Sequence, residues 1–225
     1  MNQRWPARGL YAITPDEHDT PRLLARVEAV LHGGAAWLQY RNKAASAALR
    51  VEQARALLPL CAHHGVPLII NDDWRLAQEI GAAGAHLGED DGDIGAARAA
   101  LGGGALIGAS CYDRIELARE AVAAGASYVA FGAFFPSPTK PQARRAHLSL
   151  LGDAAGLKVP RVAIGGVTVD NAASLVAAGA DLVAVITAVF EAADPASATR
   201  AFARCFPAAG ATPHLPHRER DPDED

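Results

Sequence analysis

The chain has 225 residues, half of them hydrophobic, and a formal net charge of -4 at pH 7. This length admits one large domain or two small ones, and the apolar content supports a sizeable core. The mildly negative charge gives no reason to expect nucleic acid or an anionic membrane as a partner. Three scattered cysteines are too few for a disulfide framework or a zinc cluster, so we expect a reducing, cytoplasmic compartment.

The two ends of the chain differ in composition. Residues 1–6 contain no apolar run, so we expect no signal peptide, and no stretch of about 18 apolar residues predicts a transmembrane helix. Residues 207–225 hold four prolines and a charged end with almost nothing apolar to bury. We expect this segment to be a disordered tail outside the folded domain, with a partner-binding tail as the alternative.

Short apolar runs alternate with longer, alanine-rich amphipathic stretches over residues 9–206. Strands are predicted at 9–13, 36–40, 67–71, 85–87, 106–109, 128–132, 161–164 and 182–185. Helices are predicted at about 20–33, 46–64, 73–83, 92–102, 113–124, 147–156, 168–178 and 194–205. Eight such units predict an α/β fold, a single (β/α)8 TIM barrel over residues 1–206. An open doubly wound sheet is the alternative, but no glycine-rich dinucleotide fingerprint follows the first strand.

Cations follow the second predicted strand, in the run Gln39-Tyr40-Arg41-Asn42-Lys43. In an extended segment Arg41 and Lys43 point to the same side, because they are two residues apart. Arginine offers a bidentate fork and lysine a point charge, which together suit a diphosphate. If they stood alone, the simpler interpretation would be two solvated surface cations.

Acidic residues follow the next two predicted strands, in the runs Asn71-Asp72-Asp73 and Glu89-Asp90-Asp91. The carboxyl ends of barrel strands share one rim, where active sites lie. Adjacent residues at a strand end point apart, so we expect about one inward carboxylate from each run and a helix cap from another acid of the same run. Magnesium takes one or two carboxylates together with phosphate oxygens, so the two runs indicate a magnesium site.

The later strands are followed by hydroxyls and glycines. Ser110 follows the fifth predicted strand, and residues 133–141 form a long proline-stiffened loop that is interpreted as a phosphate clamp or as an ordinary exposed loop. Gly165 and Gly166 follow the seventh strand, and the eighth ends at Ile186-Thr187. The loops after strands 7 and 8 of such barrels often bind a phosphomonoester through backbone amides. Two anion sites, one metal-assisted and one not, imply two phosphorylated substrates or one long one.

Two further residues could be called catalytic, His86 and Cys111. Neither has an evident partner in the sequence, so we expect both to be buried or half-buried structural residues.

Taken in order, these pieces resemble the thiamine-phosphate synthase family. The matching residues lie within about 9–206 and are 39–43, Asn71, Asp72, Asp91, Ser110, Ser137, Pro138, Thr139, Lys140, 164–166 and 185–187. The resemblance implies a (β/α)8 barrel that joins hydroxymethylpyrimidine diphosphate to hydroxyethylthiazole phosphate. The products are thiamine phosphate and diphosphate, and magnesium (Mg2+) is required.

The resemblance also implies roles for individual residues. The pyrimidine diphosphate would be held by Gln39, Tyr40, Arg41, Asn42, Lys43, Asn71, Ser110 and Lys140, and magnesium by Asp72 and Asp91. The thiazole phosphate would be bound by Ser137, Pro138, Thr139, Gly166, Ile186 and Thr187. Many members have a serine-rich end to strand 8, where this chain offers Ile186 and the single hydroxyl of Thr187.

The implied mechanism is a dissociative substitution, in which diphosphate leaves and the thiazole nitrogen attacks the resulting pyrimidine cation. Arg41, Lys43, Lys140 and Ser110 would be the catalytic residues, because the work of the protein is to stabilise the leaving diphosphate. The implied partners are small phosphorylated molecules, with no nucleic acid or membrane and a possible homo-oligomer.

Two alternatives remain for the function. A thiazole tautomerase binds thiazole phosphate and performs a proton shift, and a non-catalytic sensor on the same barrel would bind a phosphorylated ligand without turnover. Arg41, Lys43, Asp72, Asp91 and Lys140 argue against the tautomerase, because an isomerase has no diphosphate to neutralise. A sensor would retain Gly165 and Gly166 but has no reason to keep two metal carboxylates.

Overall fold

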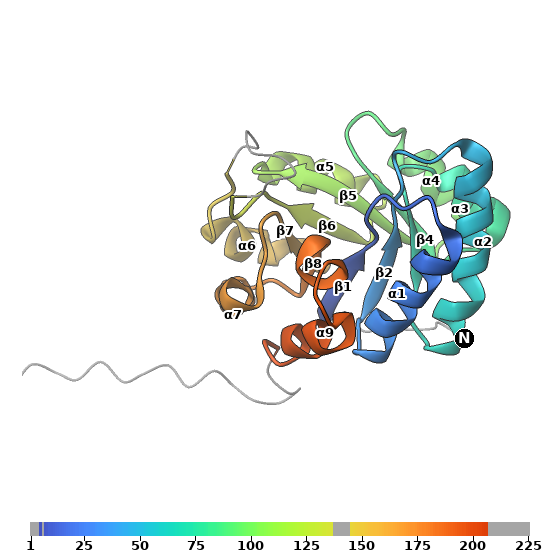
Figure 1. The fold of residues 1–225 in the computed structure, drawn as a ribbon. Helices are drawn as coiled ribbons and strands as arrows, with labels where there is room; N and C mark the ends of the chain where they lie inside the picture. The colour runs from blue at the N-terminus through green and yellow to red at the C-terminus, as the bar shows by residue number, and fades with distance from the viewer. Residues whose placement is uncertain (1–4, 6, 137–144, 207–225) are drawn as a thin grey trace, which may run out of the picture.

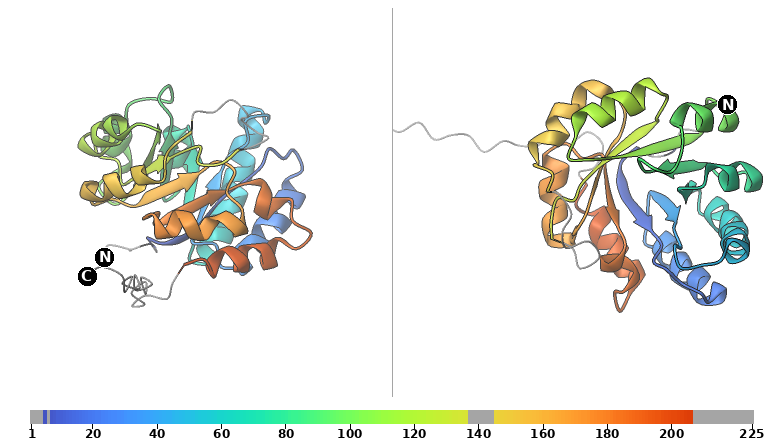
Figure 2. Two further views of the ribbon diagram at one scale, coloured as in Figure 1. Left: turned by 90° about the vertical axis from the view of Figure 1, so that its left-hand side faces the viewer. Right: turned by 90° about the horizontal axis from the view of Figure 1, so that it is seen from above.

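Eight parallel strands close into a barrel with helices around it (Figures 1 and 2) in the computed structural model, which describes residues 5, 7–136 and 145–206. The strands pair in chain order, and β8 returns to pair with β1. This closed barrel confirms the predicted fold class. The predicted tail at 207–225 lies outside the described residues, so the domain boundary after residue 206 stays a prediction.

The strands are β1 Gly9–Ile13, β2 Trp37–Tyr40, β3 Leu68–Asn71, β4 Gly84–Leu87, β5 Leu106–Tyr112, β6 Tyr128–Phe131, β7 Arg161–Ile164 and β8 Leu182–Val185. The helices are α1 Thr20–His32, α2 Ala47–His63, α3 Trp74–Ile80, α4 Ile94–Leu101, α5 Ile115–Ala123, α6 Ser149–Asp153 with the 3-10 turn η1 Ala154–Leu157, α7 Val169–Ala177, α8 Thr187–Phe190 and α9 Pro195–Ala203. Every predicted strand and helix is present. The prediction missed the short α8 and ended β5 too early, so Ser110 lies within that strand.

The helices form where a polar cap precedes an apolar stripe. Helix α1 is capped by the carboxylate of Asp19, which accepts a hydrogen bond from the Arg22 amide, and Pro21 stands in its first turn. Its buried residues, Leu23, Val27, Val30 and Leu31, recur at helical spacing and pack on the outside of the barrel. They belong to the larger of two apolar clusters, which lies between the strands and the surrounding helices.

The smaller apolar cluster fills the inside of the barrel. It contains three large rings, Tyr11, Trp37 and Tyr128, which contact one another edge to face at centroid distances of 4.9 to 5.9 Å. Gly108 makes room for them, because a Cβ at this position would lie 2.0 Å from Cζ of Tyr128. The barrel is thus a packed core whose open end is the rim of the strands.

Buried thiols lie away from this interior. Cys61 and Cys111 are 1% and 0% exposed, and burial raises the pKa of each thiol to about 12. Both therefore stay protonated, and Cys111 is buried as predicted. Among the described residues, no helix has the length and apolar character needed to cross a bilayer.

Candidate active site

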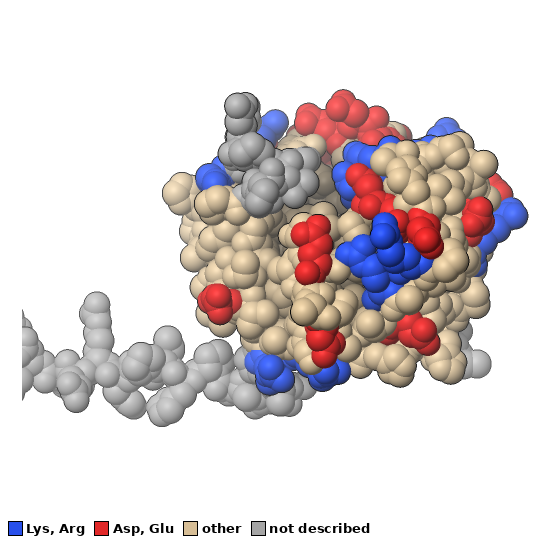
Figure 3. Space-filling model, in the orientation of Figure 1, with Lys and Arg blue, Asp and Glu red and all other residues tan. Residues whose placement is uncertain are grey.

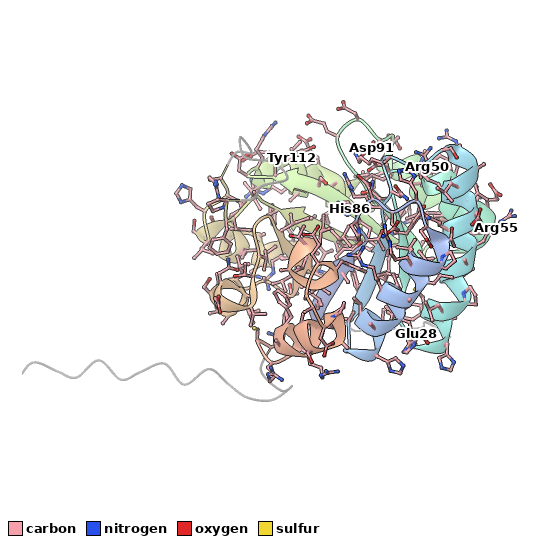
Figure 4. The ribbon with its side chains drawn as sticks, in the orientation of Figure 1. Glu28, Arg50, Arg55, His86, Asp91 and Tyr112 are labelled. Carbon is pink, nitrogen blue, oxygen red and sulfur yellow. The ribbon has the colours of Figure 1, made fainter. Side chains whose placement is uncertain are left out.

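Charged side chains are unevenly spread over the molecule. On the face drawn in Figure 3, Lys, Arg, Asp and Glu gather over the side that carries α1, α2 and α4, and the side that carries α6 and α7 is mostly uncharged. Figure 4 places Asp91 and Arg50 at the top of the molecule, with His86 below them and Glu28 at the opposite end. The charged part of the rim therefore lies above β2 to β4.

Asp72 and Asp91 bring their carboxylates together on this rim. The Asp72 backbone is left-handed, with a φ of 66°, and its amide donates to the His86 carbonyl at 2.8 Å. Asp91 Oδ2 accepts a hydrogen bond from the Gly88 amide at 2.8 Å. Burial, and then the hydrogen-bonded Asp91 carboxyl, raise the pKa of Asp72. Two carboxyls that resist shared ionisation are a suitable pair for a divalent cation.

The carboxylate pair of Asp72 and Asp91 fits magnesium. Among the described residues, no group of three or more His, Cys, Asp and Glu side chains is arranged as a metal site. Magnesium does not need three, because it keeps several waters and binds one or two carboxylates together with substrate phosphates.

The structure shows which of the acids near these two strands cap helices. Asp73 caps α3, where its carboxylate accepts from the Leu76 amide at 2.9 Å. The prediction that Glu89, Asp90 or Asp91 caps the next helix is wrong, because Asp93 caps α4. The cause is Gly92, whose φ of 112° keeps the chain out of the helix for two more residues.

The two predicted cations are held by neighbouring acids. Arg41 Nη1 lies 3.1 Å from Asp16 Oδ1, and Lys43 Nζ lies 3.1 Å from Asp72 Oδ2. The Lys43 amide also donates to Asp16 Oδ1 at 2.7 Å. The pairs are partly exposed, with Lys43 at 58%, so each contributes little to stability. Both cations can therefore turn to a more highly charged anion.

Tyr40 and Asn42 have their side chains turned toward α2. The Tyr40 hydroxyl donates to Gln53 Oε1 at 2.7 Å, and Asn42 Nδ2 donates to the same oxygen and to the Glu17 carbonyl. Gln53 Nε2 donates to the Glu17 carbonyl as well. This buried network fixes the loop after β2, and it leaves Asn42 Oδ1 without a hydrogen-bond partner among the described residues.

A cavity of about 540 Å³ opens beside the acid pair. Arg50, which the sequence interpretation missed, is part of its lining. The predicted site residues in the lining are Tyr40, Asn42, Lys43, Asn71, Asp72 and Asp91. Arg50 stands in the first turn of α2, directly after the cationic loop. A cation in the first turn of a helix that follows a barrel strand is a signal that could have found it.

Gln39 and Ser110 face the interior and are joined by a chain of hydrogen bonds. Gln39 Nε2 donates to the Tyr11 hydroxyl, which lies 2.8 Å from that of Tyr128. His86 Nδ1 lies 3.1 Å from the Tyr128 hydroxyl, and its Nε2 lies 3.0 Å from Ser110 Oγ. Burial lowers the pKa of His86 to about 4, so the imidazole is neutral. His86 is buried as predicted, but its partners are polar and were missed.

The opposite side of the rim is built from backbone. Gly165 and Gly166 have φ values of 98° and 63°, and a Cβ at Gly166 would lie 2.3 Å from the Pro136 carbonyl oxygen. The amides of Phe134 and Phe135 donate to the carbonyls of Ile164 and Gly165. The loop after β6 thus begins against the glycine pair. Its predicted ligands Ser137, Pro138, Thr139 and Lys140 lie outside the described residues.

Ile186 and Thr187 stand at the end of β8, where the chain turns into α8. Ile186 precedes the helix and Thr187 is its first residue. Neither residue belongs to the cavity beside the acid pair. The structure therefore groups Lys43, Asn71, Asp72 and Asp91 on one side of the rim and leaves Gly166, Ile186 and Thr187 on another.

Comparisons with known proteins agree with this geometry. Residues 10–189 match the family model described as thiamine monophosphate synthase. The chain is 60% identical over 200 residues to the thiamine-phosphate synthase of Xanthomonas campestris pv. campestris (strain 8004), covering 89% of this chain and 96% of the relative. It is 60% identical over 198 residues to that of Chromobacterium violaceum, covering 88% and 96%.

A solved structure shows the same relationship in three dimensions. The thiamine phosphate pyrophosphorylase from Pyrococcus furiosus superposes with a TM-score of 0.78 at 33% identity, over 89% of this chain and 96% of that one. The rim geometry, the family model and these relatives agree: the chain belongs to the thiamine-phosphate synthase family, whose members are transferases of thiamine biosynthesis.

Proposed function

We propose that the protein joins hydroxymethylpyrimidine diphosphate to hydroxyethylthiazole phosphate, forming thiamine phosphate and releasing diphosphate. The observation that carries the proposal is the paired carboxylates of Asp72 and Asp91 beside the Lys43 cation. A glycine-based site across the rim supplies a second, uncharged seat for a phosphate. The protein thus has one site for each phosphorylated substrate.

Asp72 and Asp91 would hold magnesium. When bound, the metal would neutralise part of the charge that develops on the leaving diphosphate. Burial and then the Asp91 carboxyl raise the pKa of Asp72, which supports this role, because a cation bound by the two carboxylates would offset the repulsion between their charges.

The cations of the chain would stabilise the same leaving group. Arg41 and Lys43 would exchange Asp16 and Asp72 for diphosphate oxygens, and Asn71 would add a neutral donor. Ser110 would donate a hydrogen bond from its hydroxyl to the diphosphate. Lys140, which lies outside the described residues, would complete the set.

The second substrate would bind by backbone contacts. Gly166 would let the chain approach the thiazole phosphate closely, and Ile186 and Thr187 would offer amides and one hydroxyl. Ser137, Pro138 and Thr139 would cover it, since the loop that carries them begins against the glycine pair.

The bond changes need little proton transfer by the protein. The bond between the methylene carbon and the diphosphate oxygen breaks, and both electrons leave with the diphosphate. The thiazole nitrogen then donates its lone pair to the methylene carbon of the pyrimidine cation. The protein contributes alignment of the two rings and electrostatic stabilisation, which suits a rim of fixed charges and amides.

Turnover of the purified protein tests the proposal. Both substrates are incubated with Mg2+, and thiamine phosphate and diphosphate are expected as products. Tight binding of thiazole phosphate without any product would contradict the proposal and favour a sensor, and conversion of the thiazole alone would favour a tautomerase. The cytoplasmic location and a possible homo-oligomer remain parts of the proposal.

A further inference from the structure

We infer that a hydrogen-bond chain through the barrel interior has a single direction, running from Gln39 through Tyr11, Tyr128 and His86 to Ser110. The direction makes the Gln39 end of the substrate site a hydrogen-bond acceptor and the Ser110 end a donor. Tyr11, Tyr128 and His86 are positioning residues in this assignment. The inference deepens the proposed function, because it rests on the substrate contacts proposed for Gln39 and Ser110.

The chain is continuous and crosses most of the barrel. Its four hydrogen bonds measure 2.8, 2.8, 3.1 and 3.0 Å in order from Gln39 to Ser110. The five residues come from β2, β1, β6, β4 and β5, so it connects strands that are far apart in sequence. Gln39, Tyr11, Tyr128 and His86 are all at most 9% exposed, which excludes bulk water as a competing partner.

The direction follows from counting protons. The amide nitrogen of Gln39 can only donate, so the Tyr11 oxygen accepts, and the one Tyr11 proton goes to Tyr128. The Tyr11 proton already occupies the bond between the two tyrosines, so the Tyr128 proton goes to His86 Nδ1, its other hydrogen-bond partner among the described residues. A neutral imidazole that accepts at Nδ1 carries its proton on Nε2, and therefore donates to Ser110.

Both tyrosines keep the protons that this argument requires. Burial raises the pKa of Tyr11 and of Tyr128 above the ordinary tyrosine range. Packing also holds the rings in place: the His86 and Tyr128 rings stack at 5.5 Å with an interplanar angle of 27°. Gly108 leaves the space that the Tyr128 ring occupies. The chain is therefore a fixed part of the core.

The two ends match opposite parts of one substrate. At one end Gln39 Nε2 donates to Tyr11. Gln39 Oε1 is therefore the group that can accept a hydrogen bond from a ligand, for example from an amino group on a ring. At the other end Ser110 Oγ accepts from His86, so its own proton is directed to a ligand oxygen. An aminopyrimidine that carries a diphosphate presents a donor and an acceptor in this order.

The tautomer of His86 tests the direction without any assay of turnover. The full-length protein is labelled with 15N-histidine, and the imidazole nitrogens are observed at neutral pH, with His86→Gln used to assign the signals. We expect the form that carries its proton on Nε2. Tyr128→Phe should mix the two tautomers, and Tyr112→Phe, which alters an exposed ring outside the chain, should leave the signals unchanged. A proton on Nδ1 in the unsubstituted protein would overturn the inference.

Kinetics test the consequence for the substrate. Tyr11→Phe should raise KM for the pyrimidine diphosphate about fivefold, the loss of one hydrogen bond, with KM for the thiazole phosphate unchanged. Combining Tyr128→Phe with Ser110→Ala should give less than the product of the separate effects. Equal changes in both KM values, or independent effects, would contradict a positioning role. If the protein had no synthase activity, the tautomer result would still decide the direction, so the two failures are distinguishable.

Discussion

The two sides of the rim offer different kinds of groups to an anion. Above β2 to β4 the groups are ionised side chains, with Lys43 on Asp72 and Arg41 on Asp16. At the ends of β7 and β8 the groups are glycines with positive φ and the first residue of α8. The interior beneath them differs in the same way, because His86 lies under the charged side and Val162, Leu182 and Ala184 fill the space under the other.

The difference matches what happens to each phosphate in the proposed reaction. The diphosphate gains charge as its bond to carbon breaks, so groups that carry full charge stabilise it most at that moment. The thiazole phosphate keeps its charge throughout, and uniform binding by backbone amides is sufficient. Damage to the charged side should therefore lower kcat, and damage to the backbone side should raise KM for the thiazole substrate.

Loss of one carboxylate should give the largest effect. Asp72→Asn removes one charge from the pair with Asp91 and should lower kcat by roughly 10²- to 10³-fold, with little change in melting temperature. Asp73→Asn is the matched control, since asparagine caps a helix as well as aspartate does, and it should keep near-normal turnover. Equal losses in the two variants would show that the acid run acts only through the fold.

Acid should weaken the fold through the charged side. The His86 pKa is about 4 in the folded protein and 6.5 in the unfolded chain, so unfolding takes up a proton between these values. This contribution to stability is complete above pH 6.5 and declines as the pH falls to 4, by about 3 kcal/mol in all. Urea unfolding at several pH values measures it. The same series for His86→Gln should show a flatter decline, and identical declines would contradict the prediction.

A side chain at the glycine pair should disturb the backbone side. In Gly166→Ala the new Cβ would meet the Pro136 and Phe135 carbonyl oxygens at 2.3 and 2.7 Å, in a left-handed backbone. We expect a loss of about 1–2 kcal/mol in the free energy of unfolding and a higher KM for thiazole phosphate. Gly152→Ala is the control, because among the described residues beyond its own helix and chain neighbours no atom lies within 4 Å of the new Cβ. A raised KM for the pyrimidine substrate alone would contradict the division of the rim.

The smallest effect should come from the single hydroxyl on the backbone side. Thr187→Val keeps the shape of the side chain and removes one hydrogen-bonding group. KM for the thiazole phosphate should rise about two- to tenfold, with kcat unchanged. Steady-state kinetics with each substrate varied in turn measures this, and an unchanged KM would leave the amides alone as phosphate ligands.

The sequence pattern predicted the fold well, because strands and helices are marked by residues that are close together in the sequence. Apolar runs between capped helices located all eight strands, and glycine-bounded ends fixed most boundaries within two residues. Helix α8 was missed because its four residues have neither a side-chain cap nor an amphipathic repeat. The cap of α4 was assigned to the wrong acid because only the backbone of Gly92 shows where that helix begins.

The candidate site was predicted less completely, because its chemistry depends on partners that are far apart in sequence. His86 appeared to have no partner, yet Ser110 and Tyr128 lie 24 and 42 residues away along the chain. The spacing of Arg41 and Lys43 suggested a common direction, but each cation meets an acid from a different loop. All of the site roles stay predictions, and Ser137 to Lys140 lie outside the described residues.

The pairing of β8 with β1 has a consequence for how the protein is made. Leu182 lies opposite Gly9 in this pairing, so the contact that closes the barrel joins the first strand to the last. A nascent chain cannot complete its sheet until β8 has been synthesised, and until then both β1 and β7 are unpaired edges. A chain that ends before Leu182 should therefore aggregate rather than fold into a smaller barrel.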